Sequence, residues 1–202
     1  MSRKVLTSVA AGAVLSLMSS LPAAAQTNDK VRIGAIVDMT GVYSRHGGPG
    51  VVAAGEMAIA DFGGKGNGKA IEVLSADYQN KVDITSTVVR KWMDVDNVDM
   101  VIESTDSAST LAMFRLGEEK KKVIIAAGSA TTALTNDGCM QYGIHYVYDT
   151  YALATGTGSA IVKEGGDTWF FITADYAFGY ALEGDTRRMV EANNGKVLGA
   201  VR

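Results

Sequence analysis

The feature that most constrains this fold is the regular alternation of strand-like and helix-like segments between residues 31 and 201. Several of the strand-like segments, such as 123–127 and 169–172, are continuous apolar runs, which are typical of strands covered on both faces of a parallel sheet. The predicted strands are 31–37, 70–76, 98–103, 122–127, 167–173 and 196–201. Such alternation predicts an α/β fold with doubly wound parallel sheets and right-handed crossovers.

Helical periodicity fills the intervals between these strands. Two segments each carry an apolar stripe at helical spacing, and further helices are predicted at 107–120, 150–164 and 177–193. The two stripes consist of Val52, Gly55, Ile59 and Phe62, and of Ile84, Val88, Trp92 and Val95. Residues 63–68 read as a glycine-rich turn after the first helix, and 193–195 as the exit of the last.

The N-terminus has the pattern of a secretory signal. Arg3 and Lys4 precede an apolar stretch that is rich in small residues, and 23–25 is an Ala-Ala-Ala cleavage site. We therefore expect a signal peptide over residues 1–25 that is cleaved near Ala25, rather than a permanent anchor. Export to the periplasm follows from this prediction.

Composition excludes several classes of function. The net charge of −3 and the lack of a long basic run argue against nucleic-acid binding. Cys139 is the one cysteine, so no intrachain disulfide can form, and with His46 and His145 it gives no metal-site spacing. We expect no metal and no cofactor. The sequence also lacks a Gly-x-Ser-x-Gly elbow, so an enzyme is disfavoured.

Ligands of open parallel sheets bind beyond the carboxyl ends of the strands, and four loops occupy that position here. The first, 38–50, is long and polar; Tyr43 is a candidate lid or stacking residue, although a glycine-rich helix cap is the alternative. The second, 103–110, begins a helix, where Ser107 could hold a carboxylate by its hydroxyl and backbone. Asp106 would repel an anion there unless it points away as the helix cap.

The third and fourth loops follow later strands. Small residues in the third, Gly128, Ser129 and Ala130, would allow backbone amides to approach a ligand, although a plain flexible turn is the alternative. In the fourth loop, Tyr176 or Phe178 could form a wall against an apolar ligand. Phe178 could equally be a core residue, because it is in register with Leu182, Met189 and Ala192.

At these four loops the chain resembles the type I periplasmic solute-binding proteins of ABC transporters, of the branched-chain amino acid class. The resemblance rests on the segments DMTGVYSRHGG, STDSAST, AAGSATTALT and YDTYALATGTGSAIVKEGGDTWFFITADYAFGYALE. It implies two lobes joined by a hinge that close on a small ligand. The first lobe would span 28–147. Residues 148–202 would form the start of the second lobe, which would be incomplete because the last strand has no helix after it. We therefore expect the natural protein to be longer.

The resemblance also implies roles for individual residues. Ser107 matches the family's ligand-carboxylate serine, and Gly128 and Ala130 match ligand contacts made largely by backbone. Phe178 matches an aromatic position that is commonly tyrosine, and Tyr151 is a further candidate at the crossover. The acidic partner of a ligand amino group would lie beyond Arg202. Asp106 stands where the leucine/isoleucine/valine binders have a cysteine, which leaves an amino acid and an aromatic or aliphatic acid open as ligands.

The favoured function is therefore solute binding for import, with a small-molecule ligand and a membrane permease as partners. A ligand-sensing receptor of the same fold is the first alternative, and an exported α/β enzyme is the second. A receptor would need a transmembrane segment further along the chain.

Overall fold

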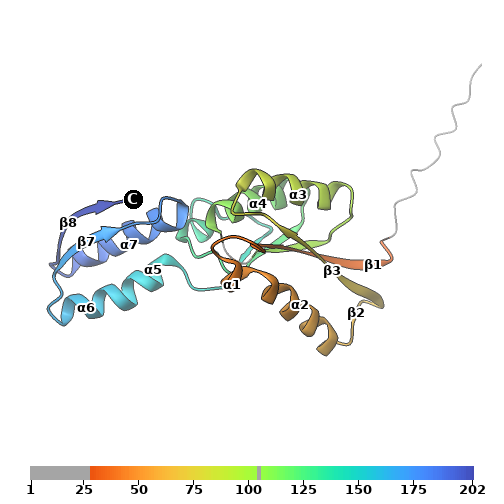
Figure 1. Cartoon of the computed structure of the whole chain (residues 1–202), viewed down its shortest axis with the longest axis horizontal. Coiled ribbons are helices and arrows are strands. Elements are labelled where there is room, and N and C mark those ends of the chain that lie inside the picture. Colours follow the sequence, from red (N-terminus) through yellow and green to blue (C-terminus); the bar gives the residue numbers. More distant parts are fainter. Residues whose placement is uncertain (1–27, 104–105) are drawn as a thin grey trace, which may run out of the picture.

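Two sheets, one mostly parallel and one parallel, organise the chain, and each is joined to its own set of helices (Figure 1). The computed structural model describes residues 28–103 and 106–202. The predicted signal peptide lies outside the described residues. We call the six-stranded sheet with its helices the first region (28–145) and the two-stranded sheet with its helices the second region (150–201).

The first region has the strand order β2-β3-β1-β4-β5-β6. Its strands are β1 (Lys30–Val37), β2 (Lys65–Gly66), β3 (Lys69–Asp77), β4 (Met100–Glu103), β5 (Val123–Ala126) and β6 (Gly143–His145). All neighbours pair in parallel except β2, which runs antiparallel to β3. The chain passes from β1 to β3 on one side and then to β4 on the other, so β1 and β4 flank a topological switch point, where such folds bind ligands.

Helices cover both faces of this sheet. The longer ones are α2 (Pro49–Asp61) on one face and α3 (Val82–Asp94) with α4 (Ser107–Lys120) on the other (Figure 1). A one-turn helix, α1 (Ser44–Gly47), precedes α2. Short turns of this kind carry no apolar periodicity, which is why the sequence did not predict α1.

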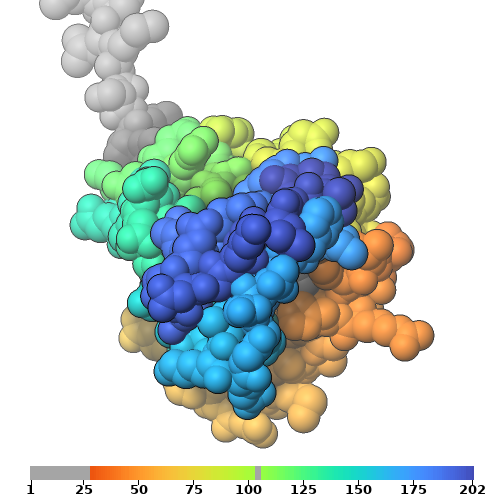
Figure 2. All heavy atoms as spheres, turned by 90° about the vertical axis from the view of Figure 1, so that its left-hand side faces the viewer, coloured from red at the N-terminus to blue at the C-terminus, as the bar shows by residue number. Residues whose placement is uncertain are grey.

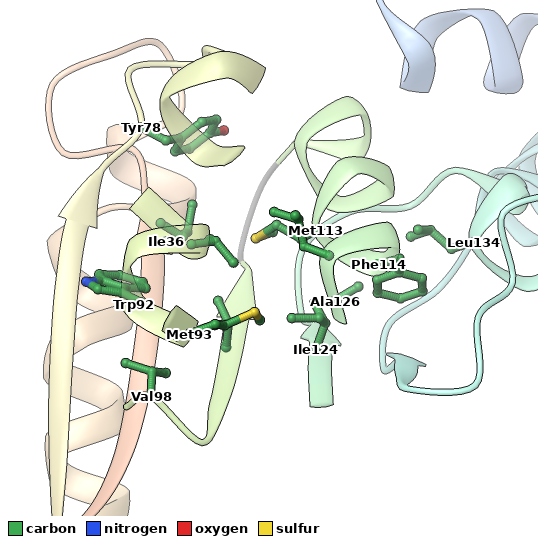
Figure 3. Close-up of a cluster of buried hydrophobic side chains, with 13 residues drawn as sticks. Ile36, Tyr78, Trp92, Met93, Val98, Met113, Phe114, Ile124, Ala126 and Leu134 are labelled. Atoms are coloured by element: carbon green, nitrogen blue, oxygen red, sulfur yellow. The ribbon is translucent and has the colours of Figure 1, made fainter. Parts of the chain in front are cut away.

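The main core lies between the sheet and the α3–α4 pair, where side chains from β1, β4 and β5 meet those of the two helices (Figure 3). Trp92 of α3 packs over Gly34 of β1, where an added Cβ would lie 2.6 Å from the indole ring. The fully buried members of this core include Ile36, Val89, Val101, Met113, Phe114 and Ile124.

The two predicted apolar stripes were only partly correct. In α3 the buried residues are Thr85, Val89, Trp92 and Met93, whereas the predicted Val95 follows the helix and is 66% exposed. No residue of α2 is buried, and Val51 rather than Val52 lines the groove of about 300 Å³ between this helix and the sheet. Gly55, Ile59 and Phe62 of the predicted stripe do line this groove, so only its first residue was wrong.

The second region pairs β7 (Thr168–Ile172) with β8 (Lys196–Val201) in parallel, and α7 (Ala177–Ala192) connects them. The helix predicted at 150–164 consists of α5 (Thr150–Leu153), one π-helical turn at Ala154–Gly158 and α6 (Ser159–Lys163). Figure 2 views the molecule from this end, with α5 to β8 in blue. Among the described residues, none of the helices has the length and apolarity needed to cross a bilayer.

Two short strands were missed by the sequence prediction. β2 forms a hairpin with β3 inside the segment that reads as a turn, and β6 is three residues long. At β6, Gly143 lies against α4, because an added Cβ would be 2.4 Å from the Phe114 ring. The close approach of strand and helix explains the glycine, but three residues give no periodic signal.

Candidate functional site

The loops that follow β1, β3, β4 and β5 meet at the carboxyl edge of the first sheet, beside the switch point. In an open α/β sheet this edge is the expected ligand position. The structure fixes each of these loops by specific hydrogen bonds, which place the predicted site residues as follows.

Asp38, directly after β1, holds the first loop in shape. Its side chain is fully buried and accepts hydrogen bonds from the amides of Gly41 (2.7 Å) and Tyr43 (2.8 Å). It also accepts one from Asn80 Nδ2 (2.9 Å), in the loop after β3. A buried carboxylate needs such partners, so the loop wraps around Asp38 and presents Tyr43 at a fixed position.

Asp77, the last residue of β3, anchors the same loop from its other side. Its carboxylate accepts hydrogen bonds from the Thr40 hydroxyl (2.7 Å) and from the amides of Met39 (3.1 Å) and Gln79 (3.0 Å). Partial burial acts to raise the pKa of Asp77, but the hydrogen bonds from Thr40, Gln79 and Met39 outweigh it, so the pKa lies below the ordinary value of an aspartate.

Tyr43 and Tyr176 join the two regions of the molecule. Their hydroxyl oxygens lie 2.6 Å apart, and their ring centroids are 6.4 Å apart. Tyr176 precedes α7 in the loop after β7, and its ring centroid lies 6.0 Å from that of Phe178. Burial, together with the hydrogen bond to Tyr43, raises the pKa of Tyr176 well above its ordinary value. The two tyrosines thus form a hydrogen-bonded pair between the first and fourth predicted loops.

Asp106 is the N-cap of α4. Its carboxylate accepts hydrogen bonds from the amides of Ala108 (2.9 Å) and Ser109 (3.1 Å) and from the Ser109 hydroxyl (2.6 Å). The capping role considered for Asp106 is therefore confirmed, and it leaves the Ser107 hydroxyl uninvolved in the cap.

Ser107 and the turn after β5 lie against each other, as the sequence predicted for two loops at one edge. Ser107 is buried, and its Oγ accepts a hydrogen bond from the Thr131 amide (3.3 Å). No other hydrogen bond joins Ser107 Oγ to the described residues, so its own proton remains available for donation.

Hydrogen bonds from α4, β6 and α5 fix the turn after β5. The Ser129 hydroxyl lies 2.5 Å from Thr110 Oγ1, and the Ser129 carbonyl oxygen lies 2.8 Å from His145 Nε2. The Ala130 carbonyl accepts a hydrogen bond from the Thr150 amide (2.7 Å). Within the part of the chain that the structure describes, the amides of Gly128 and Ala130 have no acceptor. The turn is thus fixed while two of its donors stay available.

A pocket of about 350 Å³ opens between these loops. It is lined by Val42, Tyr43, Asn80, Val82, Asp106, Ala108 and Tyr176. Of these, Tyr43 and Tyr176 were predicted as site residues, whereas Asn80 was not. Its position directly after β3, at the carboxyl edge, is the signal that could have identified it.

The other predicted site residues are not part of this lining: Ser107, Gly128, Ser129 and Ala130 lie in adjoining loops, and Phe178 and Tyr151 lie in the second region. Phe178 is half-buried and, with Leu182, lines an apolar groove of about 510 Å³ between α5, β7 and α7. This placement is compatible with the alternative of Phe178 as a packing residue of α7. The Phe178 ring contacts the ring of Tyr176, which does line the pocket. Tyr151 lies on α5, where it is 60% exposed.

One junction between the regions escaped the sequence analysis. Asp185 of α7 is buried and accepts hydrogen bonds from the hydroxyls of Thr150 (2.6 Å) and Thr132 (3.4 Å). Arg188 pairs with its other carboxylate oxygen. Thr132 belongs to the loop after β5, so Asp185 ties α7 to the first region. No local sequence pattern predicts a contact between residues this far apart in the chain.

Comparison with known proteins identifies the family to which this architecture belongs. A family model described as periplasmic binding protein matches residues 30–202. A periplasmic binding protein from Burkholderia mallei is 56% identical with a TM-score of 0.84, and the match covers 86% of this chain and 46% of that one. Comparison with curated proteins gave no match.

Two further solved structures are similar. A branched-chain amino acid ABC transporter periplasmic ligand-binding protein from Burkholderia xenovorans is 34% identical, with a TM-score of 0.74, over 86% of this chain and 46% of that one. An ABC transporter solute-binding protein from Rhodopseudomonas palustris, in complex with 3,4-dihydroxybenzoic acid, is 22% identical, with a TM-score of 0.78, over 86% and 47%.

The chain thus spans about half the length of these relatives. Their fold confirms the predicted type I α/β architecture, with its mostly parallel sheets. Because the family model matches most of the chain, and the Burkholderia mallei protein shares 56% of its residues over the matched part, the protein belongs to the periplasmic binding protein family.

Proposed function

We propose that this protein is the solute-binding component of an ABC import system, that it works in the periplasm, and that a membrane permease is its partner. It binds its ligand and releases it unchanged. The observation that carries this proposal is the meeting of loops from both regions around one pocket, with Tyr43 and Tyr176 in hydrogen-bond contact. A binder that closes around a ligand needs groups from both sides of its cleft.

The proposed ligand bears a carboxylate. Ser107 offers a hydroxyl proton at the N-terminus of α4, and the amides of Gly128 and Ala130 lie in the adjoining turn without acceptors among the described residues. Donors at a helix N-terminus suit an anion. An amino acid would agree with the Burkholderia xenovorans relative, and an aromatic acid with the Rhodopseudomonas palustris complex.

The proposed mechanism is hinge closure between a first lobe at 28–147 and a second lobe that starts at 148. The ligand docks on Ser107 and the 128–130 turn, and the second lobe then brings Tyr176 and Phe178 towards it. Ligand binding shifts the population towards the closed form, which the permease recognises.

Ligand titration on the full-length gene product tests the proposal. L-leucine and 4-hydroxybenzoate are the first probes, measured by calorimetry and by thermal shift, because a ligand that binds only the folded state raises its stability. Saturable binding that weakens in Ser107→Ala, with the compound recovered intact by mass spectrometry, is the expected result. Turnover of the compound would contradict the proposal, as would unchanged affinity in Ser107→Ala.

A further inference from the structure

His145 lies next to the turn that is proposed to hold the ligand carboxylate, on the side of β6. It is the last residue of β6, where it pairs in register with Ala126 of β5. Its Nε2 atom lies 2.8 Å from the Ser129 carbonyl oxygen. A carbonyl oxygen only accepts hydrogen bonds, so Nε2 carries a proton and donates it. The contact therefore fixes which ring nitrogen is protonated when the imidazole is neutral.

The Ser129 carbonyl and the Ala130 N–H belong to the same peptide group. Among the described residues, no peptide bond is cis. In a trans peptide group, the C=O and the N–H lie in one plane and point in opposite directions. The hydrogen bond from His145 therefore sets the direction of the Ala130 N–H, which points away from the imidazole. This N–H has no acceptor within residues 28–103 and 106–202, and it is one of the donors proposed for the ligand.

The next peptide group of the turn is held in the same way. The Ala130 carbonyl accepts a hydrogen bond from the Thr150 amide (2.7 Å), at the start of α5. At the opposite side of that peptide group, the Thr131 N–H donates to Ser107 Oγ (3.3 Å). Donors from β6 and α5 thus hold two consecutive carbonyls of the turn. The N–H of the second peptide group faces the serine that is proposed to bind the ligand carboxylate.

Burial makes the contact with His145 effective. Ser129 and Ala130 are both buried, and a hydrogen bond in such surroundings is electrostatically stronger than one in water. A peptide group that accepts a hydrogen bond at its C=O is also polarised, which makes its N–H a better donor. Both the direction and the donor strength of the Ala130 N–H therefore depend on His145.

We infer that His145 is a positioning residue of the ligand site. By donating from Nε2 to the Ser129 carbonyl, it holds the Ala130 N–H in the direction that meets the ligand carboxylate. The inference rests on the proposed function and adds to its site a residue that does not touch the ligand. What the site requires from His145 is a donor at the place of Nε2, so another side chain with a donor there should replace it.

Three substitutions at His145 test this inference in the full-length gene product. In His145→Gln, the amide nitrogen can reach the place of Nε2, whereas in His145→Asn it is one bond too short, and His145→Leu has no donor. L-leucine and 4-hydroxybenzoate are the probes, measured by calorimetry. For a compound that binds the wild type, we expect affinity to fall about two- to tenfold in His145→Asn and His145→Leu. His145→Gln should retain the wild-type affinity.

The control is the same leucine substitution at the other histidine of the described chain. His46 is an exposed residue of α1, and His46→Leu should bind as the wild type does. Thermal denaturation checks that each variant folds. A ring that served only to fill space would be replaced better by leucine than by glutamine, so rescue by His145→Gln separates the donor from packing.

The protonation of the imidazole gives a second measurement, which needs neither a ligand nor a folded variant. NMR of the ring nitrogens distinguishes a protonated nitrogen from an unprotonated one. At a pH where the ring is neutral, we expect the wild-type His145 to carry its proton on Nε2. A neutral ring with its proton on Nδ1 could not donate to the Ser129 carbonyl and would overturn the inference.

The outcomes separate this inference from the proposed function. Equal loss of affinity in His145→Gln and His145→Leu would overturn the inference alone, as would unchanged affinity in all three variants, while Ser107→Ala still tests the proposed function. If neither compound binds the wild type, the proposed function fails, and the inference fails with it.

Discussion

The Tyr43 and Tyr176 hydroxyl oxygens lie 2.6 Å apart, although the residues belong to loops that follow the first strands of two different sheets. Burial and the hydrogen bond to Tyr43 raise the pKa of Tyr176, so the Tyr176 hydroxyl stays protonated in the neutral range. This contact holds the two sides of the pocket together, and it leads to the first prediction.

Removing either hydroxyl should weaken ligand binding without changing the fold. Tyr43→Phe and Tyr176→Phe keep the ring and lose one hydrogen bond, which contributes about 0.5–1.5 kcal/mol. Calorimetric titration should therefore show affinity lowered by about two- to tenfold. Tyr146→Phe, at a residue that is 79% exposed, is the control and should bind as the wild type does. Unchanged affinity in both pocket variants would show that the pair plays no part in closure.

Ser107 and Ser109 should separate binding from stability, although both lie in the first turn of α4. Ser109 donates to Asp106 (2.6 Å), and Thr85 Oγ1 lies 3.3 Å from the Ser109 hydroxyl, so Ser109→Ala removes two hydrogen bonds between buried side chains. Urea denaturation should show a loss of about 1–3 kcal/mol for Ser109→Ala. Ser107→Ala should instead lower ligand affinity while the free energy of unfolding changes less. The reverse pattern would remove Ser107 from the site.

Acid should weaken the loop that carries Tyr43. The pKa of Asp77 in the folded protein lies below its ordinary value, so its contribution to stability is present above the pKa of the unfolded chain and is lost as the pH falls through the folded-state pKa. The free energy of unfolding, measured by denaturation at neutral pH and at successively lower pH, should decrease less with falling pH in Asp77→Asn than in the wild type. Asp61→Asn, an exposed change at the end of α2, should follow the wild-type curve.

Gly143 should be far less tolerant of a side chain than a glycine in open space. An added Cβ at Gly143 meets the Phe114 ring at 2.4 Å, so Gly143→Ala should cost about 1–3 kcal/mol of unfolding free energy. In α2, Gly55 has no atom within 4 Å of the same position. Gly55→Ala should stabilise the helix by about 0.5–1 kcal/mol, because alanine favours helix. Equal effects in urea denaturation would contradict the packing described for β6.

The sequence predicted the long elements and the edge at which the loops of the candidate site meet. Continuous apolar runs identified the buried strands, and Ser107 with the turn at 128–130 lie together because carboxyl ends of parallel strands share one edge. β6 escaped prediction because three residues carry no period. In the α2 stripe only the first residue was wrong, because Val51 and Val52 are equally apolar.

Contacts between distant residues were beyond the sequence. The role of Asn80 depends on Asp38, 42 residues away, and Asp185 reaches Thr150 from another helix, 35 residues away. Such pairs are set by how the elements pack, which no local pattern records. The predicted lobe boundary near 147 and the contributions of Tyr151 and Phe178 to ligand binding stay predictions.

The most direct test of the account is a calorimetric titration of the full-length gene product with L-leucine and with 4-hydroxybenzoate, repeated in Ser107→Ala. The account predicts saturable binding of at least one compound at one site per chain, weakened in the variant, with the compound recovered unchanged. Binding of neither compound, or equal affinity in the wild type and Ser107→Ala, would contradict it.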